Sequence, residues 1–261
     1  MNWREFKNGS DAHKVFADLA QKIRAGELDL GRQHYSLSLA IGVLTAIFCG
    51  YDRIVAIEFG VGEGDGLFEL CKAAQYFRDT FAIEIEVYGF DNAKGLPAPK
   101  GYRDHAEWWH TGQFRLKSPA RMRAKLPSFA HLVIGEVSKT VGIMAEVLAR
   151  ARLGFVAVDL DYYSSTKPAL NVFKHAPGCY LPAIPVYFDD IMYRNVTQSR
   201  WCGEALAIEE FNTENEFRKI ERKVPLLRIQ RFHVCHVLDH PIRSGDEPLR
   251  DGFSMMSLRS L

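Results

Sequence analysis

The chain lacks the features that would mark it as secreted, membrane-bound or nucleic-acid-binding. Its five cysteines are odd in number and widely spaced, with no C-x-x-C pair, which argues against a disulfide framework or a zinc site. The most hydrophobic stretch, Leu37 to Cys49, is too short for a bilayer span of about 20 helical residues. The formal net charge of +1 gives no general attraction to nucleic acid or membrane. We therefore expect a cytoplasmic protein without either partner.

Two common nucleotide-binding signatures are also missing from the glycine cluster at residues 60–66. A G-x-G-x-x-G motif counted from Gly60 meets Asp65 at its third glycine position, and one counted from Gly62 meets Leu67. No G-K-[ST] follows, so a phosphate-binding Walker loop fails as well. A nucleotide-dependent oxidoreductase is accordingly the least favoured enzyme class.

What is present is an alternation of strand and helix patterns. Helical spacing of apolar residues within 1–50 predicts two helices ahead of the first strand. Strands alternating with helices imply parallel βαβ units in an open, doubly wound α/β sheet covered on both faces. The last two strands lack a full crossover helix between them, so one of them should be antiparallel. The patterns predict strands at 53–59, 83–91, 131–136, 153–159, 183–190 and 232–238, with later helices at 67–77, 141–151, 165–176 and 204–220.

Residues 95–130 interrupt this alternation with several prolines and aromatic residues. An excursion of this length is more than a connection needs. We interpret it as a partly helical, lid-like insertion over a binding site, although an aromatic anchor that merely holds a loop to the body fits nearly as well. The whole chain, 1–261, is expected to form a single domain, and the helices within 1–50 could pack against a second copy.

The glycine cluster fits the pattern E-x-G-x-G-x-G, with Glu58, Gly60, Gly62 and Gly64. It lies between a predicted strand and a predicted helix, where glycines let the backbone turn tightly and approach a ligand. This resembles the first motif of class I S-adenosylmethionine-dependent methyltransferases. The resemblance implies that the methionine portion of S-adenosylmethionine is held by Glu58, Gly60, Val61, Gly62 and Gly64. The sulfonium and ammonium groups of this cofactor are positively charged, so nearby acids attract it. A tight turn without a ligand is the alternative.

Two further positions suit the rest of that cofactor. Asp91 closes the second strand, where a carboxylate can accept hydrogen bonds from both ribose hydroxyls. After the third strand, Glu136, Val137 and Ser138 stand where an adenine edge is expected. Helix capping would explain Asp91 and Ser138 equally well.

Acid pairs follow two other predicted strands, Asp159 and Asp161 in one and Asp189 and Asp190 in the other. If the strands are parallel neighbours, the acids converge at one edge of the sheet and raise one another's pKa unless a cation lies among them. Oxygen ligands without His or Cys suit Mg²⁺. We predict Asp159, Asp189 and Asp190 as its ligands. Asp161 could coordinate, orient a water or act as base, and helix capping by one acid of each pair is the alternative.

Four phrases in this order, IEFGVGEG, GFDNAKGLP, VDLDYYSSTKPAL and YFDDI, resemble the macrocin O-methyltransferase-like group of metal-dependent methyltransferases from bacterial natural-product pathways. The similarity covers Arg53 to Phe211. It implies a Rossmann-like, seven-stranded, mostly parallel sheet with an antiparallel last strand, and S-adenosylmethionine and Mg²⁺ as cofactors. It also implies methyl transfer to a hydroxyl of a small molecule of natural-product or sugar type, with Asp159 and Asp161 as the catalytic residues.

Several alternatives remain open at the sequence level. No histidine base follows the second acid pair, so Asp161 is the first candidate base, with Tyr163 and Lys167 as weaker ones. The histidines His233, His236 and His240 are interpreted as structural. The rival functions are a metal-independent methyltransferase with a nitrogen or carboxylate acceptor and a non-catalytic binding protein on the same fold.

Overall fold

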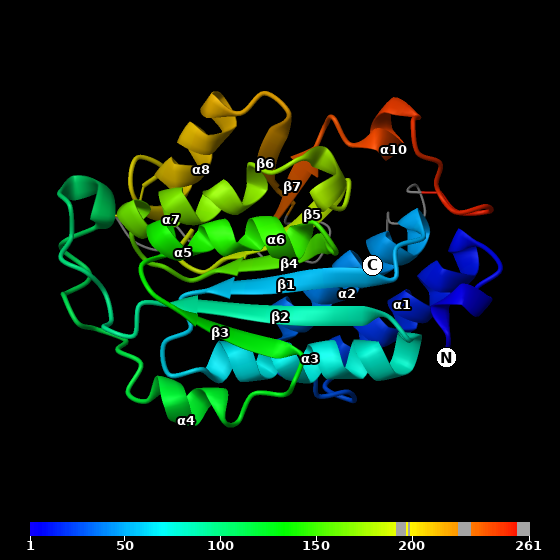
Figure 1. The fold of residues 1–261 in the computed structure, drawn as a ribbon, viewed down its shortest axis with the longest axis horizontal. Coiled ribbons are helices and arrows are strands. Elements are labelled where there is room, and N and C mark those ends of the chain that lie inside the picture. Colours follow the sequence, from blue (N-terminus) through cyan, green and yellow to red (C-terminus); the bar gives the residue numbers. More distant parts are fainter. Residues whose placement is uncertain (192–196, 198, 224–230, 255–261) are drawn as a thin grey trace.

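The computed structural model describes residues 1–191, 197, 199–223 and 231–254. A seven-stranded sheet in the order β3-β2-β1-β4-β5-β7-β6 forms its centre (Figure 1). The first five strands in sequence pair in parallel, and β7 is antiparallel to both β5 and β6. This confirms the doubly wound, mostly parallel sheet. The strands are β1 Arg53–Phe59, β2 Glu84–Asp91, β3 Ala130–Ile134, β4 Arg152–Val158, β5 Ala183–Phe188, β6 Arg218–Arg222 and β7 Phe232–Val237.

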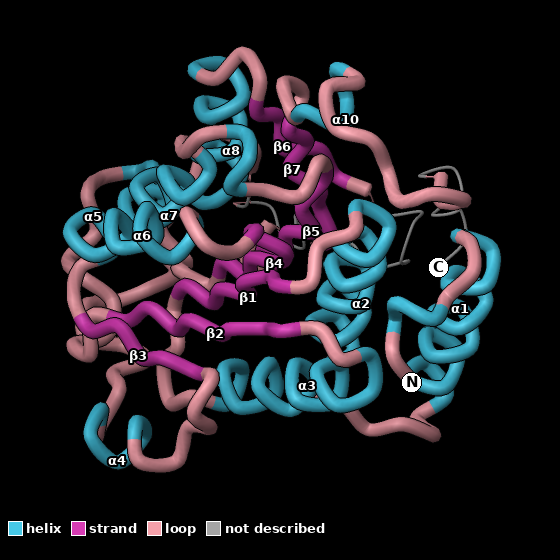
Figure 2. The backbone as a smooth tube through the Cα atoms, turned by 45° about the vertical axis from the view of Figure 1, so that its right-hand side comes forward, coloured by secondary structure: helices cyan, strands magenta, loops and turns pink. Residues whose placement is uncertain are grey.

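Helices cover both faces of this sheet (Figure 2). Helices α2 and α3 lie on one face with α1 outside them, and α5, α6 and α7 lie on the other, next to α8. No helix within the described ranges is long and apolar enough to cross a membrane. The helices are α1 Gly9–Ala25, α2 Gln33–Cys49, α3 Asp65–Phe81, α4 Pro119–Arg123, α5 Val137–Thr140, α6 Met144–Leu148, α7 Tyr163–Ala169, α8 Gly203–Glu214 and α10 Pro241–Ser244.

Helix α2 is buried along almost its whole length because it lies between α1, α3 and the sheet. Its apolar composition suits a helix without a solvent face. Close packing depends on Gly42, since a Cβ there would overlap the carbonyl oxygen of Gly154 in β4. This contact holds the middle of α2 against the sheet.

The structure corrects one predicted element. The helix expected over 204–220 ends at Glu214, and residues 218–222 form the seventh strand, β6. The Asn212 side chain joins the two elements, because it accepts a hydrogen bond from the Ile220 N–H and donates one to the Ile220 carbonyl. Pairing with β7 overrides the helical pattern of this segment.

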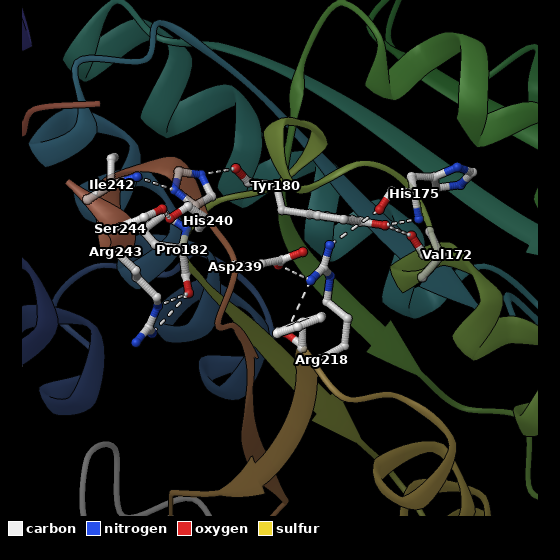
Figure 3. A network of polar contacts seen from close by, with 11 residues as sticks. Val172, His175, Tyr180, Pro182, Arg218, Asp239, His240, Ile242, Arg243 and Ser244 are labelled. Atoms are coloured by element: carbon white, nitrogen blue, oxygen red, sulfur yellow. Dashed lines mark hydrogen bonds and ion pairs between the residues drawn. The ribbon is translucent and has the colours of Figure 1, made fainter. Parts of the chain in front are cut away.

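A polar network closes the amino end of the sheet, away from the carboxyl ends of the parallel strands (Figure 3). The Tyr180 hydroxyl donates to the Val172 carbonyl over 3.0 Å, and the Arg218 guanidinium pairs with Asp239. The buried His240 ring contacts the Tyr180 carbonyl through Nε2 at 3.0 Å and accepts from the Ile242 N–H. These contacts give His240 a structural role.

Candidate active site

The carboxyl ends of the parallel strands open onto a cleft of about 670 Å³. Its walls come from the glycine loop after β1, from the residues after β4 and β5, and from parts of segment 95–117. Ligand sites of open α/β sheets lie at this edge. The cleft is therefore the candidate active site.

The glycine loop turns sharply at the end of β1. Gly60, Gly62 and Gly64 all have positive φ, at 87°, 53° and 101°. A Cβ on Gly60 would overlap the carbonyl oxygen of Asp159, so only glycine lets β1 and β4 end side by side here. The loop thus brings the predicted cofactor motif directly against the first acid pair.

Glu58 lies almost fully buried beneath this loop, with 1% of its surface exposed. The Tyr35 hydroxyl donates to Glu58 Oε1 over 2.8 Å, whereas Oε2 has no hydrogen-bond partner in the described part of the chain. Burial raises the pKa of Glu58 to about 8. A buried carboxyl with one unsatisfied oxygen is a ready acceptor for a cationic ligand group.

Asp91 joins the loops after β1 and β2. Its carboxylate accepts the Gly62 N–H over 3.0 Å and the Ala93 N–H over 2.6 Å, and burial raises its pKa. Asp91 also lines the cleft, next to Asn92. Asp91 therefore lies in the wall of the cleft, and its contact with a ribose stays a prediction.

The three residues predicted to contact the adenine lie outside the described lining of the cleft. Glu136, Val137 and Ser138 lie at the start of α5, and none of them lines the cleft. Glu136 is exposed and pairs with Lys139 over 2.9 Å. Asn92, by contrast, lines the cleft. A contact between adenine and Glu136, Val137 or Ser138 stays a prediction.

The acids after β4 and β5 do converge. Asp159, Asp161 and Asp190 each offer an oxygen atom, and these oxygens lie within 4.8 Å of one another. Asp161 has a positive φ of 58°, and it reaches this group from the residues after β4. Asp189, one of the predicted ligands, is engaged elsewhere: its Oδ1 accepts from the Tyr187 hydroxyl and from Arg231, each over 2.6 Å. The structure therefore groups Asp161, not Asp189, with the other two.

Burial and repulsion by neighbouring carboxylates, Asp189 among them, act on all three members of this acid trio, Asp159, Asp161 and Asp190. Burial is the largest cause that raises their pKa values, to about 7, 9 and 6 in that order, and the neighbouring carboxylates raise them further. Asp190 Oδ2 has no hydrogen-bond partner among the residues the structure describes. A cluster of carboxylate oxygens with an unsatisfied atom fits a hard divalent cation such as Mg²⁺.

Sequence reasoning missed three residues around the trio. Glu204, at the start of α8, is 1% exposed and accepts the Asp190 N–H over 2.9 Å. Arg231 forms an ion pair with Asp189 and so brings a positive charge close to the trio. The His105 ring lies against Gly203, the first residue of α8. None follows a strand end, so no local sequence signal pointed to them.

The weaker base candidates, Tyr163 and Lys167, lie outside the described lining of the cleft. Lys167 pairs with Glu210 and, over 2.9 Å, with Glu214, and the hydrogen bond to Glu210 is the largest cause of its raised pKa. The Tyr163 hydroxyl also donates to Glu210, over 2.6 Å. Both side chains therefore join α7 to α8. The histidines His233 and His236 lie on β7, outside the cleft lining.

The insertion is held to the body at two places. Backbone hydrogen bonds of 2.8 Å join Leu96 to both Gly112 and Gln113 and close its neck. Farther out, the buried Asp104 accepts from Ser164 at the start of α7. Segment 95–130 thus contributes a wall of the cleft and is held to α7 by polar contacts, whereas its role as a lid stays a prediction.

We expect Asp104→Ala to loosen the insertion. The Lys100 N–H, the Ser164 N–H and the Ser164 hydroxyl each donate to Asp104 over 2.7 Å, and alanine leaves all three donors unsatisfied. A loss of about 3 kcal/mol in the free energy of unfolding is expected from urea denaturation. Limited proteolysis should then cut first within 95–117. Asp104→Asn, which keeps one acceptor oxygen, should lose less, and equal losses would contradict the anchoring role.

Solved structures show what this architecture is similar to. The calicheamicin methyltransferase CalS11 aligns with a TM-score of 0.53 at 19% identity, over 77% of this chain and 77% of CalS11. The O-methyltransferase NovP aligns with a TM-score of 0.53 at 16% identity, over 86% of this chain and 98% of NovP. The chain has the class I methyltransferase fold. No protein-family model and no curated protein sequence matches it. At these identities the likeness extends to the fold, whereas the chemistry depends on this chain's own residues.

Proposed function

We propose that this chain is an S-adenosylmethionine-dependent O-methyltransferase that acts with Mg²⁺ on a hydroxyl of a small molecule. The observation that carries the proposal is one cleft that contains both the buried Glu58 under the glycine loop and the acid trio. The first suits a cationic cofactor and the second a divalent cation. Because Gly60 abuts Asp159, the two halves of the site adjoin.

Each half has a defined task in the proposed reaction. Glu58 binds the cofactor ammonium, and the glycine loop lets the backbone approach the cofactor. The acid trio would hold Mg²⁺, which when bound supplies Lewis acidity that favours loss of the acceptor's hydroxyl proton. A bound cation would lower the pKa of Asp161 and keep it ionised, and Asp161 is the candidate that takes this proton on its carboxylate. Orientation of the acceptor oxygen in line with the methyl group supplies the rest of the rate enhancement.

The wall of the cleft that comes from the insertion is aromatic. Trp109 and Phe114 line it, with ring centroids 5.7 Å apart in an edge-to-face arrangement. Such surfaces suit rings, including the apolar faces of sugars. We therefore propose a ring-bearing acceptor of natural-product or sugar type.

Calorimetry with S-adenosylhomocysteine, the demethylated cofactor, tests the first half of the proposal. We expect saturable binding with one ligand per chain; a protein that binds neither this product nor S-adenosylmethionine is not the enzyme proposed. Activity on a panel of hydroxylated small molecules tests the second half. We expect methyl transfer to be lost when EDTA is added and to recover when Mg²⁺ is restored. Activity that EDTA does not change would favour a metal-independent methyltransferase.

The affinity for S-adenosylhomocysteine should rise with pH towards about 8. Burial raises the pKa of Glu58 to about 8, so below that value the free site is mostly protonated. The ligand ammonium prefers the carboxylate, and binding therefore releases a proton, which strengthens binding by up to about tenfold per pH unit. Calorimetry at about pH 6 to 7.5, in buffers of different ionisation enthalpy, measures this release. Glu58→Gln should abolish it, and a proton release that survives in this variant would assign the linkage to another group.

A further inference from the structure

Arg32 brings a positive charge to the part of the cleft where Glu58 lies. It is the N-cap residue of α2 and lines the cleft. A Cβ placed on Gly66 would overlap Glu58 Oε1 and would lie 3.2 Å from Arg32 Nη1. The carboxyl and the guanidinium therefore converge on the same glycine, with opposite charges.

The Arg32 side chain is held in a defined position. Its Nε atom pairs with Glu69 Oε2 over 3.1 Å, and its guanidinium lies 5.4 Å from the centre of the Tyr35 ring. Tyr35 is the same residue that donates to Glu58. Glu69 engages one edge of the guanidinium, and Nη1 reaches Gly66 in the first turn of α3.

That first turn also favours an anion. Helix α3 has 17 residues, and its N-cap, Gly64, has no side chain with which to cap the first N–H groups. Free N–H groups and the positive end of the helix dipole attract a carboxylate. The unpartnered Oε2 of the buried Glu58, a few atoms away, instead requires a cation or a donor. The site therefore presents one place for an anion and one for a cation.

We infer that Arg32 and the first turn of α3 bind the carboxylate of the cofactor's amino-acid end, while Glu58 binds its ammonium. The ligand chemistry recognised is a zwitterionic α-amino acid group, in which the two charges share one carbon atom. This inference rests on the proposed function and adds a cofactor-binding residue from outside the glycine motif. Arg32 is a binding residue here, with no part in the chemical step.

The test compares two ligands on the variant Arg32→Met. S-Adenosylhomocysteine carries the amino-acid end, and 5′-methylthioadenosine lacks it. Removal of a charged hydrogen-bond partner should weaken binding of S-adenosylhomocysteine by about 10- to 100-fold. Binding of 5′-methylthioadenosine should change by less than about threefold. Calorimetry gives both affinities, and an unchanged far-ultraviolet circular dichroism spectrum shows that the variant is folded.

Lys72→Met is the matched control. Lys72 pairs with Asp29 over 2.6 Å and so ties the α1–α2 connection to α3, as Arg32 does through Glu69, but it lies outside the described lining of the cleft. The ratio of the two affinities should stay at its wild-type value in this variant. An equal loss of both ligands in Arg32→Met would overturn the inference, as would a change of the ratio in Lys72→Met. If the wild-type protein binds neither ligand, the proposed function fails instead.

Discussion

Asp190→Asn should stabilise the protein without divalent cations and destabilise it relative to the wild type when Mg²⁺ is present. In the free protein, burial is the largest cause that raises the pKa of Asp190, and the negative charge of Asp189 raises it further. Its neutralisation should add about 1 to 3 kcal/mol to the free energy of unfolding. For a chain of this size that corresponds to about 2 to 10 °C in Tm. Bound Mg²⁺ should reverse the order, because the variant lacks one ligand.

Thermal denaturation in EDTA and in MgCl₂ measures both halves of this prediction. Asp189→Asn is the informative comparison, since Asp189 is paired with Arg231 and hydrogen-bonded by Tyr187. We expect this variant to lose stability in EDTA while it keeps most of the stabilisation by Mg²⁺. If Asp189→Asn loses the Mg²⁺ effect and Asp161→Asn retains it, the ligand trio predicted from the sequence is the correct one.

Gly60→Ala should be among the most damaging single substitutions in the chain. Its Cβ would overlap the Asp159 carbonyl oxygen, and its φ of 87° disfavours any L side chain. Strain and overlap together should lower the free energy of unfolding by more than about 3 kcal/mol, because a backbone atom cannot rotate out of the way. Binding of S-adenosylhomocysteine should fall as well, since the same loop forms the cleft wall.

Gly50→Ala separates strain from overlap. Gly50 ends α2 with a φ of 76°, close to that of Gly60, and nothing lies within 4 Å of its Cβ position. Only the conformational penalty of about 1 to 2 kcal/mol is expected there. Urea denaturation of both variants gives the comparison, and equal losses would mean that the approach of β1 to β4 tolerates an added methyl group.

The fold was largely predictable because its central strands carry strong local signals. β1 contains an apolar run at residues 54–57 and β4 one at residues 153–158, as burial on both faces of a parallel sheet requires. Strand β6 carries no such signal, since its outer residues Glu221 and Arg222 are exposed and its pairing with β7 is not local. A local sequence pattern does not show that a segment will pair with a strand that comes later in the chain.

The sequence predicted which acids lie near the cleft, but not which of them face one another. Asp159 and Asp190 follow strand ends, and the topology alone brings strand ends together. Which acids face one another depends instead on backbone conformation and on charges supplied from elsewhere. The positive φ of Asp161 directs its side chain towards Asp159 and Asp190. Asp189 instead pairs with Arg231, which lies some 40 residues later in the chain. Arg32 was unpredictable for the same reason, since its position depends on how α2 packs.

The seating of α2 decides where this chain can be cut or recombined. Because the helix is buried on nearly every side and its Tyr35 reaches Glu58, a fragment beginning at β1 would expose apolar sheet and lose one wall of the ligand pocket. A chimera joined at residue 50 would likewise exchange part of the recognition surface together with a structural layer. Residues 1–50 therefore belong with the sheet and the cleft in any design that borrows them.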